Sequence, residues 1–149
     1  MEPVTGFVLN NYLGTWYEIA RMPASFEEHL THVTATYTLR EDGKVRVQNA
    51  GIDERTSKKK IAVGKAKFAR TSDIGYLRVS FFGPFYADYV IVDLDKEYSC
   101  AMVASSKRYL WILSRKPELK EGVLGRLLEK AKQLGFDTSR LYFTPQSGG

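Results

Sequence analysis

Short stretches in which apolar and polar residues alternate occupy most of the first 115 residues, and this pattern restricts the fold more than any other feature. Alternation at every second residue is typical of β-strands with one buried face, whereas helical periodicity begins only at about residue 117. Turn residues such as Gly43 and Gly75 separate the stretches and permit hairpins. The pattern predicts an all-β antiparallel barrel or sandwich of eight strands, at residues 14–22, 33–40, 44–51, 60–70, 76–82, 89–94, 98–104 and 109–115.

The parity of each stretch indicates which side chains face the interior. Tyr37 alternates with threonines, and Lys65 and Lys67 alternate with apolar residues, so the lysines and threonines are assigned to the outside. Small residues opposite large ones indicate room for a ligand within apolar and aromatic walls. The residues expected to line this interior are Ala35, Tyr37, Val47, Asn49, Ala66, Phe68, Val79, Phe81, Met102, Tyr109 and Trp111.

An amphipathic helix is predicted directly after the eighth strand. Pro117 suits a first helical position, and apolar residues recur at three- and four-residue spacing until Gly135. The eighth strand is apolar on both faces, so we expect this helix to pack on the outside of the strands. The resulting single domain covers residues 1–149, with the barrel at about 14–115, the helix at about 117–134 and a short strand at about 140–144.

Charge and cysteine content restrict the function. Lys and Arg number 22 against 17 Asp and Glu, and the net charge of +5 favours anionic surfaces such as a membrane. The densest basic run, at residues 58–60, lacks interleaved aromatics, which argues against nucleic-acid binding. Cys100 is the only cysteine, so no intramolecular disulfide can form, and His29 and His32 lack a third metal ligand. The first residues lack an apolar leader, which indicates a cytosolic protein or a trimmed export signal.

Three separated signals fall at one end of the predicted barrel. They are Gly14 and Trp16 at the start of the first strand, Asp95 between the sixth and seventh strands, and Arg115 at the end of the eighth. This combination resembles the lipocalin signature, which implies an eight-stranded up-and-down barrel. In that family the Gly-x-Trp motif closes one end and the Trp stacks under the Arg. An Arg over an indole ring contributes about 1 to 2 kcal/mol when partly desolvated, and it closes that end against water.

The amino-acid sequences of three segments indicate a particular group within this family. Residues 12–21 (YLGTWYEIAR), 80–85 (SFFGPF) and 109–115 (YLWILSR) are similar to the bacterial outer-membrane lipoprotein lipocalins, which are related to apolipoprotein D. That resemblance implies binding of fatty acid or lysophospholipid, and a place on the periplasmic side of the outer membrane. It also implies anchoring through an N-terminal lipidated cysteine, and no cysteine precedes Gly14 in this chain.

We therefore expect a protein that stores or transports a small hydrophobic ligand. The head group would meet Asn49, the Tyr37 and Tyr109 hydroxyls, or basic groups at the open mouth, namely Arg21, Lys107 and Arg108. No nucleophile, base and orienting group converge, so neither an enzyme nor a cofactor is predicted.

Two other functions stay open from the sequence. One is a lipid isomerase that depends on Cys100, which is expected to face the interior beside Met102. The other is an interaction module, such as a homodimer formed through Phe82, Phe85 and Tyr86.

Overall fold

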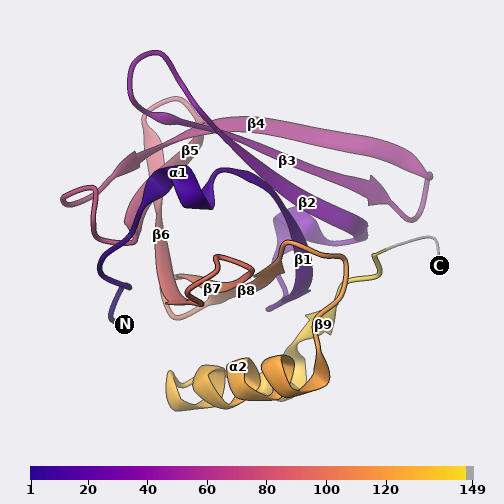
Figure 1. The fold of residues 1–149 in the computed structure, drawn as a ribbon. Coiled ribbons are helices and arrows are strands. Elements are labelled where there is room, and N and C mark those ends of the chain that lie inside the picture. Colours follow the sequence, from indigo (N-terminus) through magenta and orange to yellow (C-terminus); the bar gives the residue numbers. More distant parts are fainter. Residues whose placement is uncertain (147–149) are drawn as a thin grey trace.

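The computed structural model describes residues 1–146 and contains an antiparallel β-barrel with a helix on its outside (Figure 1). The alternating stretches form strands close to the predicted positions, which confirms the eight-stranded barrel. The strands are β1 (Gly14–Arg21), β2 (Leu30–Leu39), β3 (Val45–Asp53), β4 (Lys58–Phe68), β5 (Tyr76–Phe82), β6 (Phe85–Leu94), β7 (Cys100–Ser105) and β8 (Tyr109–Ser114).

Each strand pairs with the next along the chain, and β1 closes the ring by pairing with both β8 and β2. Because neighbouring strands run in opposite directions, the connections lie alternately at the two ends of the barrel. We call one end the closed end; it holds the connections at 39–45, 68–76 and 94–100. The other, the open end, holds the connections at 21–30, 53–58, 82–85 and 105–109.

The last described residues fill a separation between β1 and β2 near the open end. β1 pairs with β2 only over its first half, and the two-residue strand β9 (Tyr142–Phe143) pairs with the end of β1. The Gln146 side-chain amide then donates to the backbone oxygens of Glu18, at 2.8 Å, and Val33, at 2.7 Å. The C-terminal segment thus bridges two barrel strands that have parted.

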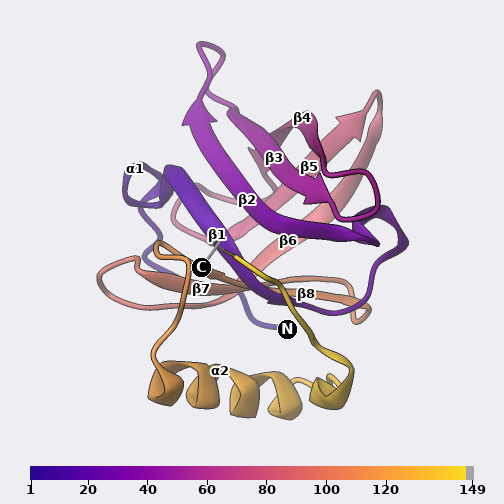
Figure 2. The same ribbon diagram turned by 90° about the vertical axis from the view of Figure 1, so that its right-hand side faces the viewer.

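Helix α2 (Glu121–Gln133) covers the outer face of β1, β6, β7 and β8 (Figure 2). Its buried Leu127 and Ala131 pack against Ile112 of β8 and neighbouring apolar side chains. The helix begins four residues later than predicted, because residues 117–120 form a connection in which Ser114 Oγ donates to the Glu118 backbone oxygen. Within residues 1–146, no helix is long and apolar enough to span a membrane.

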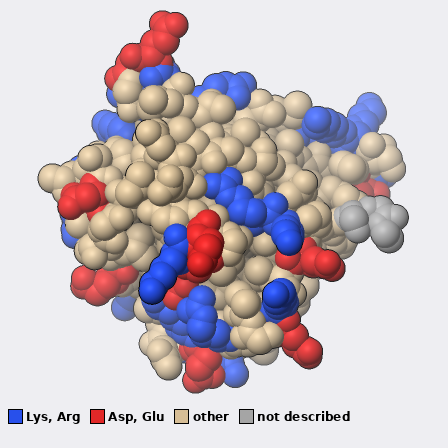
Figure 3. All heavy atoms as spheres, viewed as in Figure 1, with Lys and Arg blue, Asp and Glu red and all other residues tan. Residues whose placement is uncertain are grey.

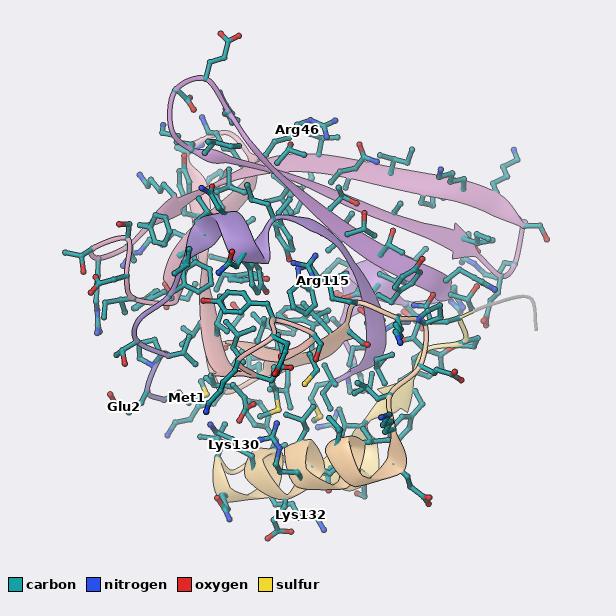
Figure 4. All side chains as sticks on the ribbon, viewed as in Figure 1. Met1, Glu2, Arg46, Arg115, Lys130 and Lys132 are labelled. Carbon is teal, nitrogen blue, oxygen red and sulfur yellow. The ribbon has the colours of Figure 1, made fainter. Side chains whose placement is uncertain are left out.

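Charged side chains of α2 point both toward the barrel and away from it. Lys130 reaches from α2 toward the barrel, where its ammonium donates to the Val92 backbone oxygen at 2.7 Å, while Lys132 points away (Figure 4). On the face seen in Figure 3, basic side chains are interspersed with acidic ones, most densely over α2. The net positive charge therefore does not form a continuous basic surface on this face.

Met102 faces α2 and not the barrel interior, so its predicted place in the ligand-binding set is corrected. It is fully buried in the cluster beneath the helix, whereas its neighbours Ala101 and Val103 belong to the cluster inside the barrel. β7 is buried on both faces, so alternation along this strand could not indicate which face was the inner one. Cys100 has the parity of Met102 and is likewise on the outer face, contrary to expectation.

The segment before β1 has structure that the sequence did not predict. Its backbone pairs with the 73–75 connection and with Ile91, and a one-turn helix, α1 (Leu9–Tyr12), follows. Phe7 and Tyr12 are buried inside the closed end. Four helical residues are too few to produce a detectable period, and this explains why the segment was missed.

Candidate ligand-binding site

The closed end is sealed by Arg115 and Trp16. The Arg115 guanidinium carbon lies 4.0 Å from the centre of the fully buried Trp16 ring, and the side chain runs beside β1 (Figure 4). Its nitrogens donate to the backbone oxygens of Tyr98, Thr15 and Asn11 at 2.9 to 3.2 Å. Gly14 has a φ of +107°, and a Cβ there would lie 3.1 Å from the guanidinium, so glycine meets both the conformational and the spatial requirement.

Asp95 stabilises the neighbouring turn. Its carboxylate accepts hydrogen bonds from the backbone amides of Ser99, at 2.6 Å, and Cys100, at 3.0 Å. The Ser99 backbone oxygen in turn accepts a bond from the Arg115 amide at 2.9 Å. Asp95 therefore acts on Arg115 through the turn and not through an ion pair.

The floor of the interior holds three tyrosine hydroxyls in a row. The Tyr89 hydroxyl lies 2.6 Å from that of Tyr12 and 2.7 Å from that of Tyr37. The rings of these tyrosines, together with apolar side chains that include Phe7 and Val79, enclose a cavity of about 10 Å³, which is the space of one water molecule. We call these three residues the tyrosine cluster.

The tyrosine cluster is uncharged at neutral pH. Burial raises the pKa of Tyr37 to about 12, and it also raises the pKa values of Tyr12 and Tyr89 well above the ordinary value. Sequence reasoning included Tyr37 but not Tyr89 or Tyr12. Alternation could not single out Tyr89, because its strand is apolar at successive positions.

Above the floor, half-buried side chains line the walls. Asn49 and Ala35 lie opposite one another on β3 and β2, and Asn49 makes no side-chain hydrogen bond within residues 1–146. The buried residues Val47 and Ala66 belong to the same inner cluster. The half-buried residues at the predicted interior positions are Ala35, Asn49, Phe68, Val79, Phe81, Tyr109 and Trp111.

Gly64 on the inner face of β4 is closely packed. A Cβ on Gly64 would lie 2.7 Å from Phe81 Cδ1 and would also collide with the Ser80 backbone oxygen. The absence of a side chain at Gly64 thus gives room to the Phe81 ring and the neighbouring backbone, and it leaves no volume for a ligand.

The first connection of the open end packs over the mouth. Phe26 is largely exposed, and its ring centre lies 5.4 Å from that of Tyr109 and 6.5 Å from that of Trp111. The Arg108 guanidinium lies 5.6 Å from the Tyr109 ring centre, and Lys107 is exposed beside it. These side chains place aromatic surface and positive charge together at the entrance.

Arg21, which the sequence predicts at the solvated mouth, lies instead in a buried ionic cluster. Its guanidinium lies 2.8 Å from a Glu18 carboxylate oxygen and 3.4 Å from Glu27 Oε2, and it donates to the Glu27 and Leu30 backbone oxygens. Trp111 Nε1 donates to Glu27 Oε1 at 2.5 Å. This cluster fastens the first connection to the barrel wall.

Burial, together with the nearby Glu18 carboxylate, raises the pKa of Glu27 to about 9. The Trp111 hydrogen bond and Arg21 oppose this shift but do not cancel it. Glu27 is therefore protonated at neutral pH, and its carboxyl adds no negative charge beside Arg21.

The structure removes the basis for the thiol-dependent alternative. Cys100 is buried on the outer face of β7, and burial raises the pKa of its thiol, which disfavours the reactive thiolate. For the dimer alternative, Phe82 and Phe85 are 79% and 77% exposed, whereas Tyr86 lies under the Lys67 ammonium, 4.4 Å from the ring centre.

Comparison with known protein families and sequences gives consistent similarities. Residues 7–146 match the family model described as a lipocalin-like domain. The chain is 50% identical over 148 residues to the outer membrane lipoprotein Blc of Vibrio cholerae, covering 98% of this chain and 86% of that protein. It is 37% identical to temperature-induced lipocalin-1 of Arabidopsis thaliana, covering 99% and 83%, and 32% identical to mouse apolipoprotein D, covering 95% and 78%.

Solved structures with similar folds are more distant in sequence. Insecticyanin from the tobacco hornworm Manduca sexta superposes with a TM-score of 0.81 at 21% identity, covering 99% of this chain and 85% of that one. A cockroach allergen, Per a 4, superposes with a TM-score of 0.78, also at 21% identity, covering 99% and 93%. At these identities the likeness concerns the fold.

Proposed function

Because this chain belongs to the lipocalin family, we propose that it carries a fatty acid or lysophospholipid inside the open half of its barrel. The observation that carries the proposal is the half-buried apolar and aromatic wall between the tyrosine cluster and the open end. Apolar side chains that are covered neither by one another nor by α2 are suited to receive an acyl chain.

The expected affinity follows from the apolar surface removed from water. An acyl chain of about a dozen methylenes gains on the order of 10 kcal/mol at about 0.8 kcal/mol each. Restricting the ligand and the first connection offsets several kcal/mol, which leaves a dissociation constant around micromolar.

The polar groups at the entrance support an anionic head group. Lys107 and Arg108 are exposed there, and Asn49 offers an amide on the inner wall. Tyr37 is less suited to a head group because its hydroxyl is engaged at the floor, and Arg21 is held in the ionic cluster. By resemblance to the outer membrane lipoproteins, we place the carrier at the bacterial outer membrane, on its periplasmic side.

The test is a titration with a fluorescent fatty acid. We expect the bound acid to quench the fluorescence of Trp111, in the barrel wall, more strongly than that of Trp16, beneath the floor. Ala35→Phe fills the interior and should weaken binding at least tenfold. Ala50→Phe places the same ring on the outer face of the neighbouring strand and should leave binding unchanged. Saturable binding with this contrast supports the proposal, and no binding, or equal effects of both substitutions, contradicts it.

A further inference from the structure

Three phenylalanines in the connections of the open end are exposed, and we call them the aromatic rim. Phe82 and Phe85 flank the two-residue turn between β5 and β6, and they are 79% and 77% exposed. Phe26, in the first connection, is 62% exposed. In the closed-end connections, by contrast, Leu39 is the only large apolar side chain that is exposed. Large apolar side chains that protrude at one end of a molecule indicate a surface that binds a partner or a membrane.

The backbone beside the aromatic rim is held by specific contacts. Ser80 Oγ donates to the Gly83 backbone oxygen at 3.1 Å, and Gly83 has a φ of +53°, a conformation that favours glycine. This turn keeps Phe82 and Phe85 side by side at the tip of the hairpin. Phe26 follows the same principle, because the next residue, Glu27, accepts the hydrogen bond from Trp111 Nε1. The folded connections thus hold the three rings in solvent.

Basic side chains outnumber acidic ones around the aromatic rim. Arg55 is left out of the comparison, because its guanidinium is paired with the Asp53 carboxylate at 2.9 Å. The other exposed charged residues of the open-end connections and the start of β4 are five basic ones, Lys58, Lys59, Lys60, Lys107 and Arg108, and two acidic ones, Glu28 and Glu54.

The closed end has no such excess of positive charge. Its three connections hold four basic residues, Arg40, Lys44, Arg70 and Lys96, and five acidic residues, Glu41, Asp42, Asp73, Asp95 and Glu97. The positive charge and the exposed phenylalanines therefore occur together, at the end where the barrel opens.

An anionic lipid surface matches both features. Phenylalanine side chains can enter the boundary between head groups and acyl chains, and lysine and arginine attract anionic head groups. A second copy of this chain matches them less well. Two open ends placed face to face would bring the basic residues of both copies together, and like charges across an interface are unfavourable.

We propose that the open end of the barrel docks on an anionic lipid surface, with the aromatic rim inserted among the lipids and the lysines at the head groups. This orientation turns the mouth toward the membrane, so that a lipid could pass between membrane and barrel without crossing water. The docking goes beyond the proposed function and does not require it, because Phe82 and Phe85 lie outside the predicted ligand-binding set.

Vesicle flotation tests the apolar part of the surface. Wild-type protein should bind vesicles of phosphatidylcholine and phosphatidylglycerol at least about tenfold more tightly than vesicles of phosphatidylcholine alone, and added salt should reduce this difference. Phe82→Ser/Phe85→Ser should weaken binding to the anionic vesicles at least about tenfold. Leu39→Ser, which removes an exposed apolar side chain at the closed end, is the matched control and should leave binding unchanged.

Two pairs of lysines test the electrostatic part. Lys58→Gln/Lys59→Gln should weaken binding to the anionic vesicles about tenfold. Lys44→Gln/Lys96→Gln removes the same charge at the closed end and should change binding less than about threefold. Equal effects of the two pairs would overturn the proposal, because they would mean that only the net charge of the protein matters.

Two other results would also overturn the docking surface. One is the absence of wild-type binding to anionic vesicles, or unchanged binding in Phe82→Ser/Phe85→Ser. The other is a wild-type dimer, detected by sedimentation without vesicles, that this double variant dissociates, because the aromatic rim would then belong to a second copy.

The fluorescent fatty-acid titration, repeated on the same variants, separates this proposal from the proposed function. The rim and lysine variants should bind the fatty acid as the wild type does. Loss of vesicle binding with intact fatty-acid binding in these variants supports the docking surface. If the wild type binds anionic vesicles but no fatty acid, the docking surface stands and the proposed function fails.

Discussion

Replacing Glu27 by glutamine should remove a pH dependence of stability that the buried ionic cluster builds into the fold. Glu27 is 8% exposed, and its pKa is raised to about 9 in the folded protein from 4.5 in the free side chain. Between these values the folded state binds a proton that the unfolded state has released. The stabilising contribution of Glu27 is thus complete below about pH 4.5 and is lost as the pH rises toward 9.

The magnitude follows from the linkage relation. Each pH unit within the window costs up to about 1.4 kcal/mol of unfolding free energy, so the wild-type protein loses at most about 4 kcal/mol between pH 5 and pH 8. In Glu27→Gln, the new amide oxygen can still accept from Trp111 Nε1, and the neutral amide no longer takes up or releases a proton. The variant should therefore be as stable as wild type near pH 5 and more stable at pH 8.

Urea unfolding of both proteins at pH 5, 6.5 and 8 measures this difference. Titrating groups that are present in both proteins cancel in the comparison. Glu28→Gln is the matched control, since the neighbouring Glu28 side chain is 68% exposed and its replacement should leave the slope unchanged. Parallel pH profiles for wild type and Glu27→Gln would contradict this prediction, because they would mean that Glu27 is ionised in the folded protein.

Three further substitutions test other parts of the structure by denaturant unfolding. Arg115→Ala removes the contact with Trp16 and three hydrogen bonds, and should cost about 2 to 3 kcal/mol while ligand binding persists; unchanged stability would contradict the sealing role. Gly64→Ala should cost about 1 to 3 kcal/mol by overpacking, whereas Gly122→Ala, in open space on α2, should gain up to about 1 kcal/mol; equal effects would argue against the close packing at Gly64. Leu127→Ala should cost about 2 to 5 kcal/mol, and a cost below about 1 kcal/mol would mean that α2 is loosely attached.

The barrel and the outer helix were predictable because their patterns reflect burial on one face. In β2, for example, threonines alternate with Ala35 and Tyr37, and only one register places the apolar set inside. The same logic failed for Met102. Because α2 covers the outer face of β7 and the barrel interior covers the inner face, both faces of this strand are buried and apolar. Alternation reports burial, and it does not report which of two buried faces is the inner one.

The site was less predictable than the fold because it depends on contacts between distant segments. Tyr12 and Tyr89 meet across 77 residues, and neither position carries a local signal of that pairing. Arg21 looked like a solvated mouth residue because its partner Glu27 lies outside the strands, in a short 3-10 turn (Ser25–Glu27) of the connection after β1. Hydrogen-bond networks of this kind require the folded geometry before their members can be identified.

The bridge between β1 and β2 places a constraint on when the chain can finish folding. Glu18 lies in the first strand, yet its carboxylate accepts a hydrogen bond from Thr144 Oγ1, 126 residues later, and Gln146 spans the parted strands beyond it. Until the ribosome has released residues 142–146, the barrel has an unfilled seam and an exposed strand edge. This seam is therefore filled only by a segment made after all eight barrel strands, and a chain stalled after β8 would leave the end of β1 unpaired on one side.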